Sequence, residues 1–417
     1  MGAVHRCGIV LPSTAPTFAA MAQARIFVND TQDRIRRGHP WVFATQIVKE
    51  EGNYEPGDIV QVLDAKRRPL GQGYINPSSM IRVRLLTSMV EDRINKAFLE
   101  QRLATAWNYR KHLGYTGSHR VIFGEADLLP GLVVDKFQDV EGEEHTVLSV
   151  QFLTLGMERW KDVVVDALQE LITPHGIYLR NDVPIREKEG LVQEKGPVGA
   201  GFRTDLIIRE NELRLHVDVA GGQKTGHFLD QVENHAAMRR ISSGKRVLDC
   251  FTHTGGFALH AGAYGAAEVE GLDISADAVS QATRNAALNG LDKVRFREAN
   301  VFDHLTNASR TGQHWDVIVL DPPAFAKSKG ALENAYRGYK EINLRALKCI
   351  PPGGFLVTCS CSQHMTPELF RRMVEEAAWD AGRRVREVYS GGQPADHPVL
   401  WGVPETHYLK CLVLEVR

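Results

Sequence analysis

The sequence predicts an α/β protein in which a Rossmann-like, doubly wound and mostly parallel sheet follows two smaller domains, a β-barrel and an α+β unit. The chain has 417 residues, more than one compact core ordinarily holds, so several domains are expected. From Leu213 to the end, runs of strand type alternate with runs of helix type across short loops. This alternation is typical of parallel βαβ units, whose ligands lie at the carboxyl ends of the strands.

The first 94 residues divide into a tail and a barrel. Residues 1–23 show no hydrophobic periodicity, so we expect a disordered tail, and Met21 is an alternative start of the chain. In residues 24–94, alternating runs between Gly, Pro and Asn turns predict an antiparallel barrel with strands at 25–28, 58–63, 71–75 and 81–85. Basic residues cluster at 34–37, which includes Arg36 and Arg37, and at 66–68. Such clusters are either solvated turns or contacts with RNA, and composition leaves both open.

Residues 95–203 are expected to form an α+β central domain. A long amphipathic helix is predicted at 94–113 and a second helix at 156–171. Strands are predicted at 121–123, 132–135, 146–150 and 176–180. The glycine-rich stretch 190–203 is interpreted as a connecting loop.

Residues 204–417 carry the doubly wound sheet. Strands are predicted at 246–249, 268–273, 294–296, 316–321, 354–358 and 407–416. Helices are predicted at 257–264, 276–289, 332–349 and 366–382. The functional residues should therefore be those that end these strands.

Composition excludes several classes of protein. With 50 Lys and Arg against 51 Asp and Glu, the net charge of −1 excludes a uniformly basic nucleic-acid binder and an acidic tail. The six cysteines have no C-x-x-C spacing, which argues against a disulfide scaffold and a cysteine-rich zinc site. We expect free thiols, a cytoplasmic location and no metal. No run of 18 apolar residues exists, so no membrane partner is expected.

The strand at 246–249 ends at Asp249 and leads through a glycine turn, Gly255-Gly256, into a helix. Glycines let backbone N–H groups approach a ligand, and a helix N-terminus favours an anionic group. The turn lacks the G-x-G-x-x-G pattern, which disfavours a nicotinamide dinucleotide. A tight turn that binds nothing is the alternative.

Polar side chains also end the next two strands. Asp273 is placed to accept both hydroxyls of a ribose, or else to cap the helix that begins near Ala276. Asn300 is placed to bind an adenine edge through its amide, although Asn is also an ordinary turn residue.

The fourth strand ends in Asp321-Pro322-Pro323-Ala324-Phe325. The two prolines remove backbone donors and stiffen the exit, which fixes Asp321 at the mouth of the cleft. Its carboxylate suits a ring N–H or an exocyclic amine of a planar heterocycle, and Phe325 offers an apolar wall. A plain turn is the alternative.

The fifth strand ends in Thr358-Cys359-Ser360-Cys361-Ser362. Cysteine is commonly a small buried residue, but a thiolate at the mouth of the cleft can act as a nucleophile. Cys359 and Cys361 lie on the same face of a strand, so alternation does not decide between them.

An upstream segment, 221–231, combines Gly, Lys and Thr with Phe228 and lacks the spacing of a nucleotide triphosphate loop. We interpret it as a flexible lid over a cofactor.

Together these motifs resemble the class I S-adenosylmethionine (SAM)-dependent methyltransferases, which have a seven-stranded sheet. More closely they resemble the large-subunit ribosomal RNA (cytosine-C5) methyltransferase I family, over residues 24–417. The resemblance rests on the glycine turn, Asp273, Asp321-Pro-Pro, the Thr-Cys-Ser-Cys-Ser run and the segments 39–43, 123–131, 223–231 and 395–398. It implies that residues 24–94 form a PUA-type RNA-binding barrel and that the cofactor is SAM.

The resemblance also implies roles for individual residues. Those implied to bind the cofactor are Asp249, Phe251, Thr254, Gly255, Gly256, Asp273, Asn300, Gln223 and Phe228. Those implied to contact the substrate are Pro322, Pro323, Phe325, Arg36 and Arg37. Cys361 is the implied nucleophile, with Asp321 as its catalytic partner, and Cys359 is implied to pack. The family usually has Asp where this chain has Asn300, and related enzymes carry a second cysteine where this chain has Ala324.

The expected function is therefore formation of 5-methylcytosine in large-subunit ribosomal RNA through a covalent cysteine adduct at C6. The alternatives are a guanine or adenine nitrogen methyltransferase acting on RNA and a non-catalytic RNA-binding ribosome assembly factor. A small-molecule methyltransferase is disfavoured by the long N-terminal domains. A homodimer is compatible with the sequence.

Overall fold

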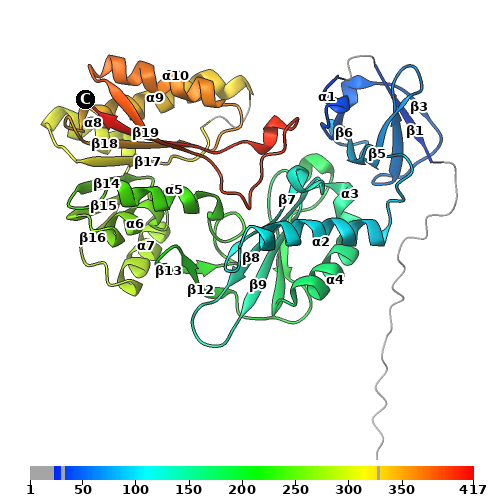
Figure 1. The fold of residues 1–417 in the computed structure, drawn as a ribbon, viewed down its shortest axis with the longest axis horizontal. Coiled ribbons are helices and arrows are strands. Elements are labelled where there is room, and N and C mark those ends of the chain that lie inside the picture. Colours follow the sequence, from blue (N-terminus) through cyan, green and yellow to red (C-terminus); the bar gives the residue numbers. More distant parts are fainter. Residues whose placement is uncertain (1–22, 30–32, 326–328) are drawn as a thin grey trace, which may run out of the picture.

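A computed structural model describes residues 23–29, 33–325 and 329–417 of the chain. The expected tail, with Met21, lies outside these residues except for Gln23. Figure 1 shows an N-terminal β domain, a central α+β domain and a C-terminal α/β domain arranged around one long C-terminal excursion. No helix among the residues described here is long and apolar enough to cross a membrane.

The N-terminal domain is a six-stranded sheet with one short helix, α1 (Asp33–Arg36). Its strands are β1 (Arg25–Val28), β2 (Trp41–Phe43), β3 (Ile47–Glu51), β4 (Ile59–Leu63), β5 (Pro69–Ile75) and β6 (Ile81–Thr87), in the order β2-β6-β5-β4-β1-β3. Aliphatic side chains that alternate along these strands form its core, among them Ile26, Val60 and Val83. The expectation of a purely antiparallel barrel is wrong, because β1 pairs with β4 in parallel.

The central domain is a five-stranded mixed sheet packed against α2 (Lys96–His112) and α4 (Lys161–Ile172). Its strands are β7 (His119–Phe123), β8 (Leu132–Gln138), β9 (Thr146–Phe152), β10 (Gly176–Asn181) and β11 (Glu194–Pro197), in the order β11-β10-β9-β8-β7. The Asn95 side chain caps α2 by accepting a hydrogen bond from the backbone of Phe98 at 3.0 Å.

Two sequence expectations for this domain are wrong. The predicted helix at 156–171 is two helices, α3 (Leu155–Glu158) and α4, because the chain leaves helical hydrogen bonding around Trp160. The predicted loop at 190–203 contains β11, which pairs with β10 at the sheet edge. A separate hairpin of β12 (Asp205–Glu210) and β13 (Leu213–Asp218) then leads to the C-terminal sheet.

The C-terminal domain is a seven-stranded sheet in the order β16-β15-β14-β17-β18-β20-β19. The strands are β14 (Arg246–Cys250), β15 (Glu268–Asp273), β16 (Val294–Glu298), β17 (Val317–Leu320), β18 (Phe355–Ser360), β19 (Val385–Gly391) and β20 (Lys410–Val416). All neighbouring strands are parallel except β20, which is antiparallel to both β18 and β19. The order reverses between β14 and β17, which places a crevice at their carboxyl ends.

Helices cover both faces of this sheet (Figure 1). The helices are α5 (Val232–Ala237), α6 (Gly256–Ala263), α7 (Ala276–Leu288), α8 (Val301–Thr311), α9 (Leu332–Lys348) and α10 (Pro367–Asp380). Successive residues of one strand face opposite cores: Val247 packs with α6 and α7, whereas Leu248 packs with α8, α9 and α10. This double burial explains why the central strands are continuous apolar runs.

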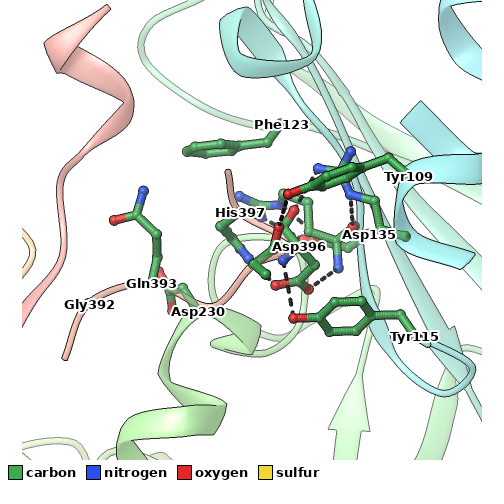
Figure 2. Close-up of polar contacts among 12 residues, drawn as sticks. Tyr109, Tyr115, Phe123, Asp135, Asp230, Gly392, Gln393, Asp396 and His397 are labelled. Carbon is green, nitrogen blue, oxygen red and sulfur yellow. Dashed lines mark hydrogen bonds and ion pairs between the residues drawn. The ribbon is translucent and has the colours of Figure 1, made fainter. Parts of the chain in front are cut away.

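Residues 392–408, between β19 and β20, leave this sheet and reach the other two domains (Figure 1). Asp396 and His397 lie between Phe123 and Tyr115 of the central domain (Figure 2). The Asp396 carboxylate accepts a hydrogen bond from the backbone of Arg120 at 2.8 Å, and the Asp396 carbonyl accepts one from Arg110 at 2.6 Å. These contacts dock the C-terminal domain on the central one.

The same excursion reaches the N-terminal domain. His39 Nε2 lies 2.9 Å from Glu405, which also forms an ion pair with Arg34. Trp41 donates a hydrogen bond from Nε1 to Glu125 of the central domain at 2.8 Å. The His39-Pro-Trp-Val-Phe43 segment therefore lies where all three domains meet.

Candidate active site

A cavity of about 660 Å³ lies at the carboxyl ends of β14, β15, β17 and β18. Its volume is within the range of small-molecule sites. The predicted residues on its walls are Gln223, Phe228, Phe251, Thr254, Gly256, Asp273, Asn300, Asp321, Pro322, Pro323, Phe325 and Cys361. The fold thus brings together side chains that lie far apart in the sequence.

The turn after β14 forms one wall of the cavity. Phe251 and His253 have φ values of 64° and 50°. Gly255, the residue before α6, has a φ of 97° and, contrary to expectation, does not line the cavity. A Cβ on Gly256 would lie 2.5 Å from the ring of His235, so only glycine lets these two elements approach. The turn is held open by its left-handed backbone and exposes Thr254 and Gly256 to the cavity.

Asp249 is a correction to the expected site, because it does not line the cavity. It is 1% exposed, and its Oδ2 accepts hydrogen bonds from the Thr252 hydroxyl at 2.6 Å and the Ala258 backbone at 3.0 Å. Its Oδ1 is buried without a hydrogen-bond partner. Burial raises the pKa of Asp249 to about 7. These hydrogen bonds connect the turn to α6.

Asp273 and Asn300 face the cavity from the ends of β15 and β16. Asp273 accepts hydrogen bonds from the backbone of His253 and of Ser275, both at 2.9 Å. Ser275, not Asp273, caps α7, so the capping alternative for Asp273 is wrong. Asn300 does cap α8: its Oδ1 accepts from the backbone of Phe302 at 2.9 Å. That bond occupies the amide oxygen and leaves the Asn300 NH₂ group for a ligand.

Asp321 lies at the end of β17, where Pro322, Pro323 and Phe325 continue the wall. Its Oδ2 accepts a hydrogen bond from Gln231 at 2.9 Å. Burial raises the pKa of Asp321 to about 6, although His235 nearby opposes the rise. A carboxyl group with this pKa exists in both protonation states near neutral pH.

The structure distinguishes between the two cysteines, which the alternation of strand faces could not do. Strand β18 ends at Ser360, Cys359 is fully buried in the sheet core, and Cys361 lies on the cavity wall. Burial and then the Asp321 carboxylate raise the pKa of the Cys361 thiol, while Lys224 and Lys410 act in the opposite direction. Lys410 is buried and donates to the carbonyls of Ser362 and Tyr408, both at 2.7 Å.

The segment interpreted as a lid forms one wall of the cavity. Thr225, His227 and Asp230 are buried. Thr225 donates a hydrogen bond to Asp135 of the central domain, and Asp230 accepts one from Tyr408 at 2.6 Å. Burial acts to raise the pKa of Asp230, yet Lys224, His397 and this hydrogen bond hold it well below its ordinary value.

A buried cluster behind this wall was not anticipated. Glu210 of β12 accepts from His227 at 2.7 Å and from His235 at 2.6 Å. Burial disfavours the charge on His235, but Glu210 outweighs it and raises the His235 pKa. Glu210, His235 and His260 have ligand atoms within 4.8 Å of one another, a set of the kind that can hold a metal ion. Here an ion pair and hydrogen bonds account for the contacts, since Asn211 lies 3.1 Å from His260 Nε2.

Arg36 and Arg37 are not brought to the cavity. Both belong to the N-terminal domain, where Arg36 forms an ion pair with Asp64 at 2.7 Å. Arg37 instead lines a second hollow with Asp33, Arg34 and Gly402. Their expected contact with the substrate would be made outside the cavity.

Comparison with known proteins assigns this architecture to known families. Residues 29–88 match a family of PUA-like domains, and residues 199–399 match the S-adenosylmethionine-dependent methyltransferases. The ribosomal RNA large subunit methyltransferase I of Cronobacter sakazakii is 40% identical over 396 residues, which are 94% of this chain and 98% of the relative. The chain belongs to this family. The Shewanella denitrificans member is 42% identical over 390 residues, 92% of this chain and 96% of that one.

Solved structures confirm the fold. A SAM-dependent methyltransferase from Streptococcus mutans superposes with a TM-score of 0.77 at 19% identity, covering 94% of this chain and 99% of that one. SMU.776, solved in complex with SAH, gives a TM-score of 0.78 at 19% identity and the same coverage. The expected sheet, PUA-like domain and SAM-dependent family are thereby confirmed.

The cavity fits SAM, the cofactor of the matched methyltransferase family. It combines a carboxylate at Asp273, an amide at Asn300 and a glycine turn that exposes backbone, with aromatic rings at Phe228 and Phe251. These groups match a ribose, an adenine edge, an amino-acid moiety and a planar base.

Proposed function

We propose that this protein transfers a methyl group from SAM to carbon 5 of a cytosine in large-subunit ribosomal RNA. The observation that carries the proposal is that Cys361 and Asp321 line the same cavity, on the adjacent strand ends of β18 and β17. The relatives named as large-subunit ribosomal RNA methyltransferases support the RNA substrate.

The cofactor would occupy the part of the cavity between β14 and β16. Asp273 would accept the ribose hydroxyls, the Asn300 amide would face the adenine, and the turn at Thr254–Gly256 would hold the amino-acid part. Gln223, Phe228 and Phe251 would close over it. When bound, SAM supplies an electrophilic methyl group on a positively charged sulfur.

A cysteine is needed because C5 of cytosine is a poor nucleophile while the ring is aromatic. The Cys361 thiolate forms a bond to C6, and the electron pair of the C5–C6 double bond makes C5 nucleophilic. C5 takes the methyl group, which leaves S-adenosylhomocysteine as the second product. A base then removes the C5 proton, the C5–C6 double bond forms again, and the Cys361 thiolate is expelled.

The protonated form of Asp321 matches the hydrogen-bonding edge of cytosine. A neutral carboxyl donates one hydrogen bond and accepts another, as N3 and the N4 amine require. Transfer of its proton to N3 neutralises the charge that develops when Cys361 attacks. The pKa of about 6 keeps such a proton available near neutral pH.

The target base must leave its stack to enter the cavity. Unstacking costs a few kcal/mol, less in single-stranded or loop RNA than in a duplex. The PUA-like domain would hold the RNA backbone while the catalytic domain binds the base.

The direct test incubates the full chain with labelled SAM and large-subunit ribosomal RNA and identifies the labelled nucleoside by mass spectrometry. We expect 5-methylcytidine, its loss in Cys361→Ala, and its retention in Cys359→Ala. SAM affinity, measured by calorimetry, should be the same in both variants. A labelled purine, or full activity of Cys361→Ala, would contradict the cytosine-C5 reaction; absence of SAM binding would support the assembly-factor alternative.

A further inference from the structure

Trp401 is the most exposed large hydrophobic residue that the described part of the chain contains. It is 92% exposed, on the excursion between β19 and β20. Its loop is nevertheless well fixed: Val403 is fully buried, and the Leu400 backbone donates to the Thr406 hydroxyl at 3.0 Å. An indole held outside on a fixed loop contributes nothing to the core and leaves a large aromatic face free for a ligand.

Beside Trp401 the loop forms a hollow with the N-terminal domain. The hollow has a volume of about 390 Å³ and is lined by Asp33, Arg34, Arg37 and Gly402. A Cβ on Gly402 would lie 2.6 Å from the Arg37 carbonyl oxygen, and the φ of Gly402 is 92°. Glycine at this position therefore lets the tryptophan loop lie directly against the arginine segment.

Arg37 differs from the two arginines near it. Arg34 pairs with Glu405, and Arg36 pairs with Asp64. Arg37 is exposed, and within residues 23–29, 33–325 and 329–417 no carboxylate forms an ion pair with it. The part of the chain that the structure describes therefore leaves its guanidinium available for an anionic group.

This surface is connected to the nucleophile. Gln363, two positions after Cys361, donates a hydrogen bond to the Glu405 carbonyl at 3.1 Å. Glu405 in turn binds Arg34 and His39 of the N-terminal domain. The excursion therefore contacts both the segment that follows Cys361 and the PUA-like domain.

We propose that Trp401 and Arg37 bind an unpaired nucleotide of the RNA that flanks the target base. The flanking base stacks on the indole of Trp401, and its phosphate contacts Arg37. The inference rests on the proposed function, because it assumes an RNA whose target base enters the cavity. It assigns a site for single-stranded RNA that is separate from the cavity.

Stacking should supply more of the binding than charge. Asp33 lines the same hollow, and Glu405 neutralises Arg34, so the net positive charge at the site is small. Loss of the indole should therefore weaken binding by a factor that depends little on salt, in contrast to the loss of a phosphate contact.

The test measures the affinity of the full chain, without SAM, for a labelled single-stranded RNA of about 12 nucleotides and for a duplex of the same sequence. The matched control is Trp379→Ala, since Trp379 is 83% exposed on α10. Trp401→Ala should weaken single-strand binding roughly 5- to 100-fold. Trp401→Phe should retain most of the affinity, Arg37→Gln should weaken binding less and in a salt-dependent way, and duplex binding should not change.

Equal affinities of Trp401→Ala and Trp379→Ala for the single strand would overturn the proposal. A wild-type protein that does not bind the single strand would also overturn the proposal. An effect of Trp401→Ala seen only with an assembled large-subunit particle would assign the surface to a protein partner and overturn it as well. Because binding is measured without methyl transfer, a loss of affinity in Trp401→Ala supports this site even if the methylated nucleoside is not 5-methylcytidine.

Discussion

Gln231 donates a hydrogen bond from Nε2 to Oδ2 of Asp321 at 2.9 Å. The Gln231 amide is itself oriented, because its Oε1 accepts from Asn234 Nδ2 at 2.6 Å. Asn234 also donates to the Gly392 carbonyl at 3.0 Å, where the C-terminal excursion begins. A chain of hydrogen bonds thus fixes the Asp321 carboxyl from α5 and the start of the C-terminal excursion.

Replacing Gln231 by Leu should move the pH dependence of methyl transfer upward. The lost hydrogen bond stabilises the ionised form of Asp321, so its pKa should rise above about 6. A hydrogen bond to a charged group contributes about 1.5–3 kcal/mol, which corresponds to roughly one to two pH units. The high-pH limb of kcat/KM should shift by that amount. A limb that stays in place would show that protonated Asp321 is not the reactive form.

Replacing Lys224 by Met should make the Cys361 thiol less reactive at a given pH. Lys224 stabilises the thiolate, so its loss should raise the Cys361 pKa further. The measurement is the alkylation rate of Cys361 against pH, followed by mass spectrometry of its peptide. Lys224→Arg is the control, because it keeps the charge and should alkylate like the wild type. Coincident profiles of all three proteins would contradict the electrostatic role.

Replacing Asp249 by Asn should stabilise the fold at high pH. The folded-state pKa of about 7 lies above the ordinary aspartate value of 3.8, so the folded protein binds more protons and loses stability as pH rises between these values. The midpoint of urea unfolding should be higher for Asp249→Asn than for the wild type, by a difference that grows as pH rises through this window and is constant above it. Asp166→Asn, exposed on α4, should show no such trend. A gain that is constant with pH would exclude the titration.

Replacing Gly256 by Ala should weaken both the fold and SAM binding. The added Cβ would lie 2.5 Å from the His235 ring, which is buried and paired with Glu210. Overpacking of this kind costs about 1–3 kcal/mol and would displace the turn. Thermal unfolding and calorimetry with SAM should both report the change. Gly117→Ala is the control, because its Cβ would meet nothing within 4 Å, and equal effects of the two variants would contradict the steric explanation.

The central strands and their end residues could be predicted because both faces of β14 and β17 are buried. Their apolar runs are therefore continuous, and Asp321 directly follows β17. Two edge strands could not be predicted, because β19 has no buried side chain and β11 consists of Glu-Lys-Gly-Pro. The strands β2 and β3 and the hairpin of β12 and β13 were not predicted either, although buried and more exposed residues alternate along β13.

The site shows the same limit. Sequence spacing predicts that Asp249 lies at a strand end. It does not predict the direction of the side chain, which accepts a hydrogen bond from the Ala258 backbone. The pairing of Glu210 with His227 and His235 depends on how the hairpin packs on the sheet, which no local pattern encodes. The sequence contains the Glu and the His residues, but it shows neither their burial nor their contacts.

The excursion at 392–408 also determines how the molecule can be divided. A fragment that begins at residue 204 would retain every cavity-lining residue. Asp396 would nevertheless lose Arg110 and Arg120, and Glu405 would lose Arg34 and His39. Conversely, the first two domains expressed alone would leave the buried Arg110 without its contact to Asp396. The three domains are therefore interdependent parts, and the catalytic half is not a detachable module that could be grafted onto another RNA-binding protein.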